Sequence, residues 1–236
     1  MEALNVVVAK HSRWGFWKCF DRLRLEGCQW NHKRVHRVYC AMKLNLPRRT
    51  KKRLPVRILC PLLAPAEHNR IWAMDFMHDA LYGGRKFRTF NAIDESNREG
   101  LAIEVGTSIP SARVIRVLER LIDQYGKPDS LRMDNGPEFI SSAFEEWCQE
   151  RGIRRLFIKP GKPDQNAFAE RFNRTYRTEV LNQYVFESIE QVQLLTDEWL
   201  HMYNHERPHD SLGRVPPLTY LPRQSVSRNS SCQVST

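Results

Sequence analysis

The amino-acid sequence predicts an α/β fold: a mixed five-stranded sheet flanked by helices, with a small helical segment at its N-terminal end. Three strand-like apolar runs follow one another between residues 71 and 106, separated only by turn signals. Helix-like and strand-like runs then alternate from residue 111 onward. Consecutive strands followed by alternating helices and strands build a mixed sheet with helices packed against it.

The beginning of the chain predicts the helical segment. Residues 12–27 have an amphipathic helical pattern that ends in a glycine, and residues 31–46 form a second one with Asn31 as its N-cap. Two short helices joined by a glycine-containing turn predict a helix-turn-helix-like unit, although any helical hairpin shares this pattern.

The core elements follow from hydrophobic periodicity and end signals. The predicted strands are residues 71–81, 86–94, 100–106, 130–134 and 153–158, and the predicted helices are residues 111–126, 137–152, 164–184 and 188–205. Ser111 is the expected N-cap of the first of these helices, and Gly126 is its expected end.

Four segments are expected along the chain. They are a basic helix-turn-helix-like segment over 1–46, a basic proline-rich linker over 47–67, the α/β core with a C-terminal helical extension over 68–222, and a polar tail over 223–236.

Positive charge is concentrated at one end of the chain. The net charge is +10, and residues 1–60 hold 15 Lys/Arg against 3 Asp/Glu, whereas residues 61–236 hold 22 against 24. A solvated charged face explains basic residues but not their confinement to one end. The asymmetry favours a segment that neutralises phosphates, and therefore a nucleic-acid partner.

Composition excludes several classes of protein. A hydrophobic content of 41% argues against wholesale disorder. No apolar run approaches the roughly 18 to 20 residues of a membrane span, and the first residues do not resemble a signal peptide. The six cysteines form no CxxC pair, so reduced thiols are expected. We expect a cytoplasmic, nucleoid-associated protein with no membrane partner.

One cysteine and histidine spacing raises the alternative of a zinc site. Cys28, His32, His36 and Cys40 recur every four residues. Four ligands along one helical stripe would be strung out rather than tetrahedral, so a helix face is the favoured interpretation.

Three acids lie where catalytic carboxylates are expected. Asp75 lies within an apolar strand, Asp134 ends the strand "LRMD", and Glu170 lies on a later helix with 35 residues between it and Asp134. Each acid alone is more typical of a structural role, with Asp75 paired to an arginine and Glu170 facing solvent. Together at one sheet edge they would repel one another unless cations lay between them, and hard oxygen ligands of this kind suit Mg²⁺.

The motifs around these acids carry a family resemblance. "WAMDF", "LRMDNGPEF" and "KPGKPDQNAFAERFNRTYRTEVL" resemble the catalytic core of retroviral-type integrases and bacterial insertion-sequence transposases. With "YNHERPHDSLG", the sequence looks most like the second-reading-frame transposase of the insertion-sequence-three family. The resemblance covers about residues 14–222. The His-His-Cys-Cys zinc module of retroviral integrases is not matched in residues 11–40, which favours the bacterial relatives.

The resemblance implies a ribonuclease H-like fold and a metal-binding triad of Asp75, Asp134 and Glu170. It also implies Mg²⁺-dependent 3′-end cleavage and strand transfer of transposon DNA, with two ions expected and Mn²⁺ able to substitute. The expected contacts with double-stranded DNA are Lys159, Lys162, Gln165, Asn166, Arg171, Arg174 and Arg177 near the triad, and Lys33, Arg34 and Arg37 in the N-terminal segment. Gln165 and Asn166 have an alternative interpretation as a polar helix start.

The sequence therefore predicts a metal-dependent DNA transposase that acts as a homo-oligomer on DNA. Family members usually need an upstream DNA-binding and dimerising segment, so an upstream-frame protein or a frameshift fusion is an expected partner. The alternatives are a non-catalytic DNA-binding remnant of a mobile element and, without support from any motif, a structure-selective nuclease on the same fold.

Overall fold

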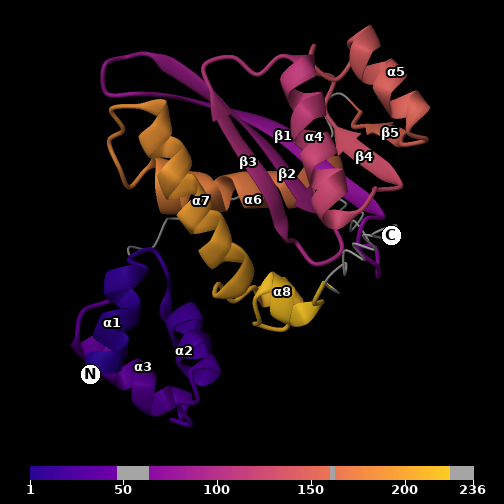
Figure 1. The fold of residues 1–236 in the computed structure, drawn as a ribbon. Helices are drawn as coiled ribbons and strands as arrows, with labels where there is room; N and C mark the ends of the chain where they lie inside the picture. The colour runs from indigo at the N-terminus through magenta and orange to yellow at the C-terminus, as the bar shows by residue number, and fades with distance from the viewer. Residues whose placement is uncertain (47–63, 160–162, 224–236) are drawn as a thin grey trace, which may run out of the picture.

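The computed structural model describes residues 1–46, 64–159 and 163–223 (Figure 1). Most of the predicted linker, the predicted DNA contact Lys162 and all of the predicted tail beyond its first residue lie outside these described ranges. Within them, no helix is both long and apolar enough to cross a membrane.

Three helices form the N-terminal unit. They are α1 (Glu2–Lys10), α2 (Phe16–Leu25) and α3 (His32–Ala41). The sequence predicted α2 and α3 but not α1. The N-cap of α3 is confirmed, because the Asn31 side chain accepts a hydrogen bond from the Lys33 backbone N–H at 2.9 Å. Leu4, Val7 and Tyr39 are among the buried side chains that join the three helices in one small core.

A five-stranded mixed sheet forms the centre of the molecule, as predicted. Its strands are β1 (Ile71–Ala80), β2 (Lys86–Asp94), β3 (Gly100–Gly106), β4 (Ser130–Met133) and β5 (Arg154–Phe157). The order is β3-β2-β1-β4-β5. β2 runs antiparallel to both β1 and β3, whereas β4 runs parallel to β1 and β5 runs parallel to β4.

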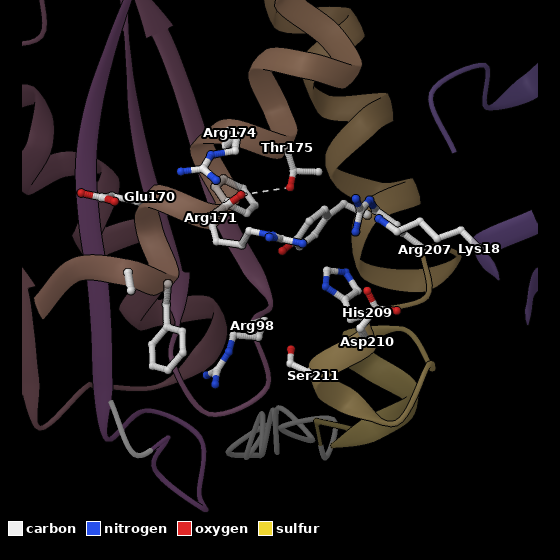
Figure 2. A pocket seen from close by; sticks show the side chains of 14 residues that line it. Lys18, Arg98, Glu170, Arg171, Arg174, Thr175, Arg207, His209, Asp210 and Ser211 are labelled. Atoms are coloured by element: carbon white, nitrogen blue, oxygen red, sulfur yellow. Dashed lines mark hydrogen bonds between the residues drawn. The ribbon is translucent and has the colours of Figure 1, made fainter. Parts of the chain in front are cut away.

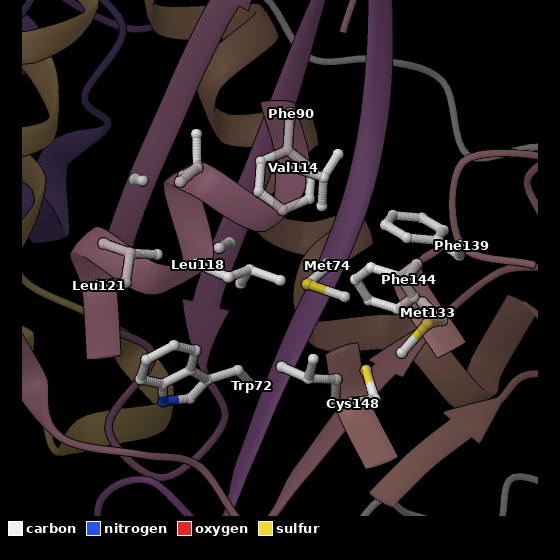
Figure 3. Close-up of a cluster of buried hydrophobic side chains, with 14 of the residues drawn as sticks. Trp72, Met74, Phe90, Val114, Leu118, Leu121, Met133, Phe139, Phe144 and Cys148 are labelled. Carbon is white, nitrogen blue, oxygen red and sulfur yellow. The ribbon is translucent and has the colours of Figure 1, made fainter. Parts of the chain in front are cut away.

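Helices cover both faces of the sheet because side chains alternate along its strands. On β1, Trp72 and Met74 enter a core with α4 (Ser111–Tyr125) and α5 (Ser142–Glu150), which Figure 3 shows. Ala73 on the same strand faces the opposite core, which contains α6 (Ala167–Tyr176) and α7 (Ile189–His205). Residue 75 therefore points to the α6 side.

Several helix boundaries differ from the prediction, and α3, for example, ends at Ala41 rather than at residue 46. Ser111 is the first residue of α4 rather than its N-cap, because Pro110, whose ring fixes an extended φ of −71°, takes the cap position. The predicted helix over 137–152 begins only at Ser142, where Ser141 caps it through its hydroxyl. The predicted helix over 164–184 is divided into three parts.

These parts are a 3₁₀ turn η1 (Pro163–Asn166), α6 itself and a π-helical turn η2 (Arg177–Leu181), and they end three residues earlier than expected. Two short helices, η3 (Asp210–Leu212) and α8 (Pro217–Tyr220), follow α7.

Candidate active site

The sheet register brings two of the three predicted acids to the same level. In the parallel pair of β1 and β4, Ala73 lies opposite Arg132. Two residues further along each chain come Asp75 and Asp134, the latter directly after β4. Because side chains two residues apart lie on one face of a strand, both acids belong to the face that α6 covers.

Asp75 is held by a chain of amide side chains. Its Oδ1 accepts a hydrogen bond from the Phe76 backbone N–H at 2.9 Å, and its Oδ2 accepts one from Asn173 Nδ2 on α6 at 2.7 Å. Asn173 Oδ1 in turn accepts a hydrogen bond from Asn91 Nδ2 at 2.6 Å, and Asn91 is the register partner of Asp75 on β2. The ionised carboxylate accepts hydrogen bonds only, which fixes the direction of the chain.

Glu170 lies on α6 one helical turn before Asn173, so the two side chains are neighbours on the helix. Ala169 and Phe172 beside them are buried against the sheet and anchor the helix there. Asn166 anchors the preceding turn η1, since its Nδ2 donates to the Met74 carbonyl oxygen of β1 at 3.2 Å. The elements thus place Glu170 on the side of the sheet that carries Asp75.

Burial and neighbouring charges both act on the pKa of Asp75. Burial is the main cause that raises the pKa of Asp75 to about 6, and the charges of Asp134 and Glu170 raise it further. Hydrogen bonds from the Phe76 backbone and from Asn173 oppose this shift. The pKa of Asp75 therefore responds to both other acids as like charges.

The arrangement has the chemistry of a metal site without a closed cage. Nowhere in the part of the chain that the structure describes do three or more His, Cys, Asp or Glu side chains come close enough to hold an ion as they stand. The carboxylates of Asp75, Asp134 and Glu170 are nevertheless the hard oxygen donors that Mg²⁺ prefers. The donor set fits such an ion if the side chains draw together around it.

The predicted DNA contacts near the triad are dispersed. Arg171 and Arg174 are exposed on α6, whereas Arg177 forms an ion pair with Asp79 at 3.0 Å. Gln165 accepts a hydrogen bond from the Lys159 backbone N–H at 2.8 Å, with Lys159 itself exposed.

Two further groups of predicted contacts lie elsewhere. Asn166 is buried, and its contact with β1 puts it inside the fold rather than on the surface. Lys33, Arg34 and Arg37 are exposed on α3 in the N-terminal unit.

Sequence reasoning missed Asn91 and Asn173. The signal for Asn91 was a polar residue inside the apolar strand "KFRTFNAID", and the signal for Asn173 was its spacing of three residues from Glu170. Within the Cys/His spacing, His32 and His36 contact the rings of Trp17 and Phe16, and Cys40 Sγ lies 3.6 Å from His36 Nε2.

Comparison with known proteins gives the family. Two family models, both described as "Integrase core domain", match the chain over residues 65–163 and residues 151–217. A chain of the simian T-cell lymphotropic virus intasome, solved by cryo-electron microscopy with a PP2A regulatory subunit, has a TM-score of 0.53 and 20% sequence identity. The match covers 86% of this chain and 70% of that one, and it shows the ribonuclease H-like fold.

Two relatives come from bacterial insertion elements. A protein of element IS407 from Burkholderia multivorans is 33% identical over 228 residues, which cover 95% of this chain and 82% of the relative. A 39.2 kDa protein of element IS476 from Xanthomonas euvesicatoria is 40% identical over 210 residues, or 89% of this chain, and the match spans 61% of that relative's length. The chain belongs to the family of insertion-sequence transposases with a retroviral-type integrase core domain.

Proposed function

We propose that this chain catalyses metal-dependent 3′-end cleavage and strand transfer of insertion-element DNA, with Asp75, Asp134 and Glu170 as the catalytic carboxylates. The observation that carries the proposal is the shared level of Asp75 and Asp134 on neighbouring parallel strands, with α6 packed on the same face. The effect of both other acids on the pKa of Asp75 supports the assignment of Glu170 to the same site.

Asp75, Asp134 and Glu170 would hold Mg²⁺, with two ions expected and Mn²⁺ as a substitute. When bound, these ions supply Lewis-acid stabilisation of the attacking and leaving oxygens of a phosphodiester. The chain's own residues orient the carboxylates. Asn173 holds one oxygen of Asp75, and the Gly136 backbone N–H donates to Asp134 Oδ1 at 3.1 Å.

The reacting partner in this proposal is double-stranded DNA, both as element ends and as target. In cleavage, water attacks a phosphodiester of the element and releases a 3′-hydroxyl. In strand transfer, that hydroxyl attacks a phosphodiester of the target and displaces the 3′-hydroxyl of the target strand. A homo-oligomer is proposed because two element ends must be joined to one target. An upstream-frame product or fusion is a proposed partner, and the cytoplasmic nucleoid is the proposed site of action.

The test is cleavage of a labelled duplex that carries the element's terminal repeat. In Mg²⁺ or Mn²⁺ we expect cleavage by the wild-type chain, its loss in EDTA, and a drop of about a hundredfold or more in Asp134→Asn, because several kcal/mol of transition-state stabilisation is removed. Asp123→Asn, an exposed acid on α4, is the matched control and should cleave normally.

Cleavage that survives Asp134→Asn would exclude this site. Binding of the terminal duplex without cleavage by the wild type, with or without the upstream-frame product, would instead identify a DNA-binding remnant.

A further inference from the structure

A basic pocket lies between the N-terminal unit and the core, beside α6, and Glu170 of the proposed triad is one of its lining residues. It has a volume of about 490 Å³, and five cations from four parts of the chain line it. These cations are Lys18 of α2, Arg98 of the turn between β2 and β3, Arg171 and Arg174 of α6, and Arg207 after α7. The acids among its lining residues are Glu170 and Asp210.

Figure 2 shows how Glu170 and Arg171 leave α6 at the pocket. Arg171 extends across the pocket toward Lys18 and Arg207, whereas the carboxylate of Glu170 extends away from them. Glu170 and Arg171 are consecutive on α6, so their side chains leave the helix about 100° apart. The helix α6 therefore directs the Glu170 carboxylate away from the cations while it carries Arg171 into the pocket.

Most of the positive charge in the pocket is not neutralised. Arg207 is paired with Glu179 at 2.9 Å, but within the described ranges Lys18, Arg171 and Arg174 take part in no ion pair. Burial and the charge of Arg207 lower the pKa of Lys18 to about 8. The cations thus repel one another, and a bound anion would offset this repulsion.

Arg98 stacks on an aromatic ring of the pocket lining. Its guanidinium stacks on the Phe168 ring at 3.4 Å, and its Nη1 is buried with no hydrogen-bond partner among the residues that the structure describes. Its backbone has a φ of 64°, a conformation that suits glycine or asparagine better than arginine. The turn therefore gives no reason for an arginine here, and the Arg98 Nη1 is left with an unused capacity to donate a hydrogen bond.

Resting on the proposed function, we propose that this pocket binds a backbone phosphate of a DNA strand that passes from the proposed active site to the N-terminal unit. Guanidinium groups recognise phosphate oxygens through paired hydrogen bonds, and lysine adds a point charge. The volume suits one nucleotide unit, and the cationic lining does not suit an apolar ligand. Lys18, Arg98 and Arg171 are the phosphate ligands, and Arg207 supports them from its pair with Glu179.

The experiment measures binding of a labelled duplex to the full chain in EDTA, so that no cleavage occurs, over a series of salt concentrations. The double variant Lys18→Ala/Arg171→Ala should bind more weakly. Its negative slope of log affinity against log salt should become shallower by about 0.9, which corresponds to one lost phosphate contact. The loss should be equal for element-end and unrelated duplexes, because phosphate contacts do not read sequence.

The matched control is Arg116→Ala/Arg154→Ala, which removes two exposed cations outside the pocket and should keep the wild-type slope. Arg171→Lys, which keeps the charge, should retain most of the slope, and it serves as the folded comparison if the double variant has a lower melting temperature.

An unchanged slope in a double variant with a wild-type melting curve overturns the proposal. If inorganic phosphate stabilises the wild type but not the double variant, while their DNA slopes agree, the pocket takes a free anion and the proposal of a DNA contact is also overturned. These outcomes are separate from the proposed function, whose failure appears as cleavage that survives Asp134→Asn.

Discussion

At the scale of single residues, Asp75 is the most constrained group of the candidate site. Its carboxylate faces two other acids, yet it depends on one amide from α6 and one backbone N–H for its orientation. The Asn173 amide nitrogen is directed at Asp75 because the Asn173 oxygen accepts a hydrogen bond from Asn91. The sequence identified the acids from their motifs, but the amide chain depends on strand register and on the packing of α6, which no local pattern encodes.

Replacement of Asn173 tests this amide chain. Asn173→Ala leaves the buried Asn91 amide without an acceptor and takes a donor from Asp75, so we expect a loss of about 1–3 kcal/mol in the free energy of unfolding. Urea denaturation measures it. The control Asn182→Ala removes an exposed asparagine and should cost less than about 0.5 kcal/mol. Equal losses in the two variants would show that the amide chain is not a stabilising unit.

At the scale of helices and strands, the sheet was predictable because alternation and turn signals define its strands locally. The start of α4 and the division of the predicted 164–184 helix were not, because they depend on Pro110 and on where residues such as Asn166 attach to the sheet. The helix α1 was missed because its segment "NVVVAK" contains three consecutive β-branched valines, which favour helices weakly. The helix is stabilised by the burial of Leu4 and Val7 against α2 and α3.

The approach of the helices to β3 can be tested at Gly100. A Cβ atom there would lie 2.4 Å from Leu200 Cδ1 on α7 and 2.8 Å from Phe172 Cε2 on α6. We expect Gly100→Ala to destabilise the fold by about 1–3 kcal/mol in urea, since both helices must shift. Gly83→Ala is the control, because nothing lies within 4 Å of its added methyl group. A Gly100→Ala variant as stable as this control would contradict the close packing.

At the scale of the whole molecule, charged side chains join the N-terminal unit to the end of the core. Glu206 accepts from Lys10 at 2.9 Å and lies 3.7 Å from Arg22, and the Arg214 guanidinium lies over the Trp17 ring at 4.5 Å. The sequence predicted a basic N-terminal unit from charge alone. It could not predict this docking, because the paired residues are separated by almost the whole chain and each looks like an ordinary surface charge.

Docking buries Lys18 in the basic pocket, and this should cost stability in the absence of DNA. The lysine loses its proton near pH 8 in the folded chain because of burial and the charges of Arg207 and Arg171, which Glu179 and Asp210 only partly oppose. An unfolded lysine keeps its proton to about pH 10.4, so the unfolded state binds more protons between these values and stability rises with pH.

Lys18→Met keeps an unbranched side chain that is one atom shorter and removes its charge. At pH 7 we expect this variant to be more stable than the wild type by about 1–3 kcal/mol in urea, with the difference shrinking as the pH rises from 8 toward 10. The same variant should bind DNA more weakly, because the lysine that costs stability in the free chain is a proposed phosphate ligand. A wild type that is equally or more stable at pH 7 would contradict the unfavourable burial of Lys18, whatever the result for DNA.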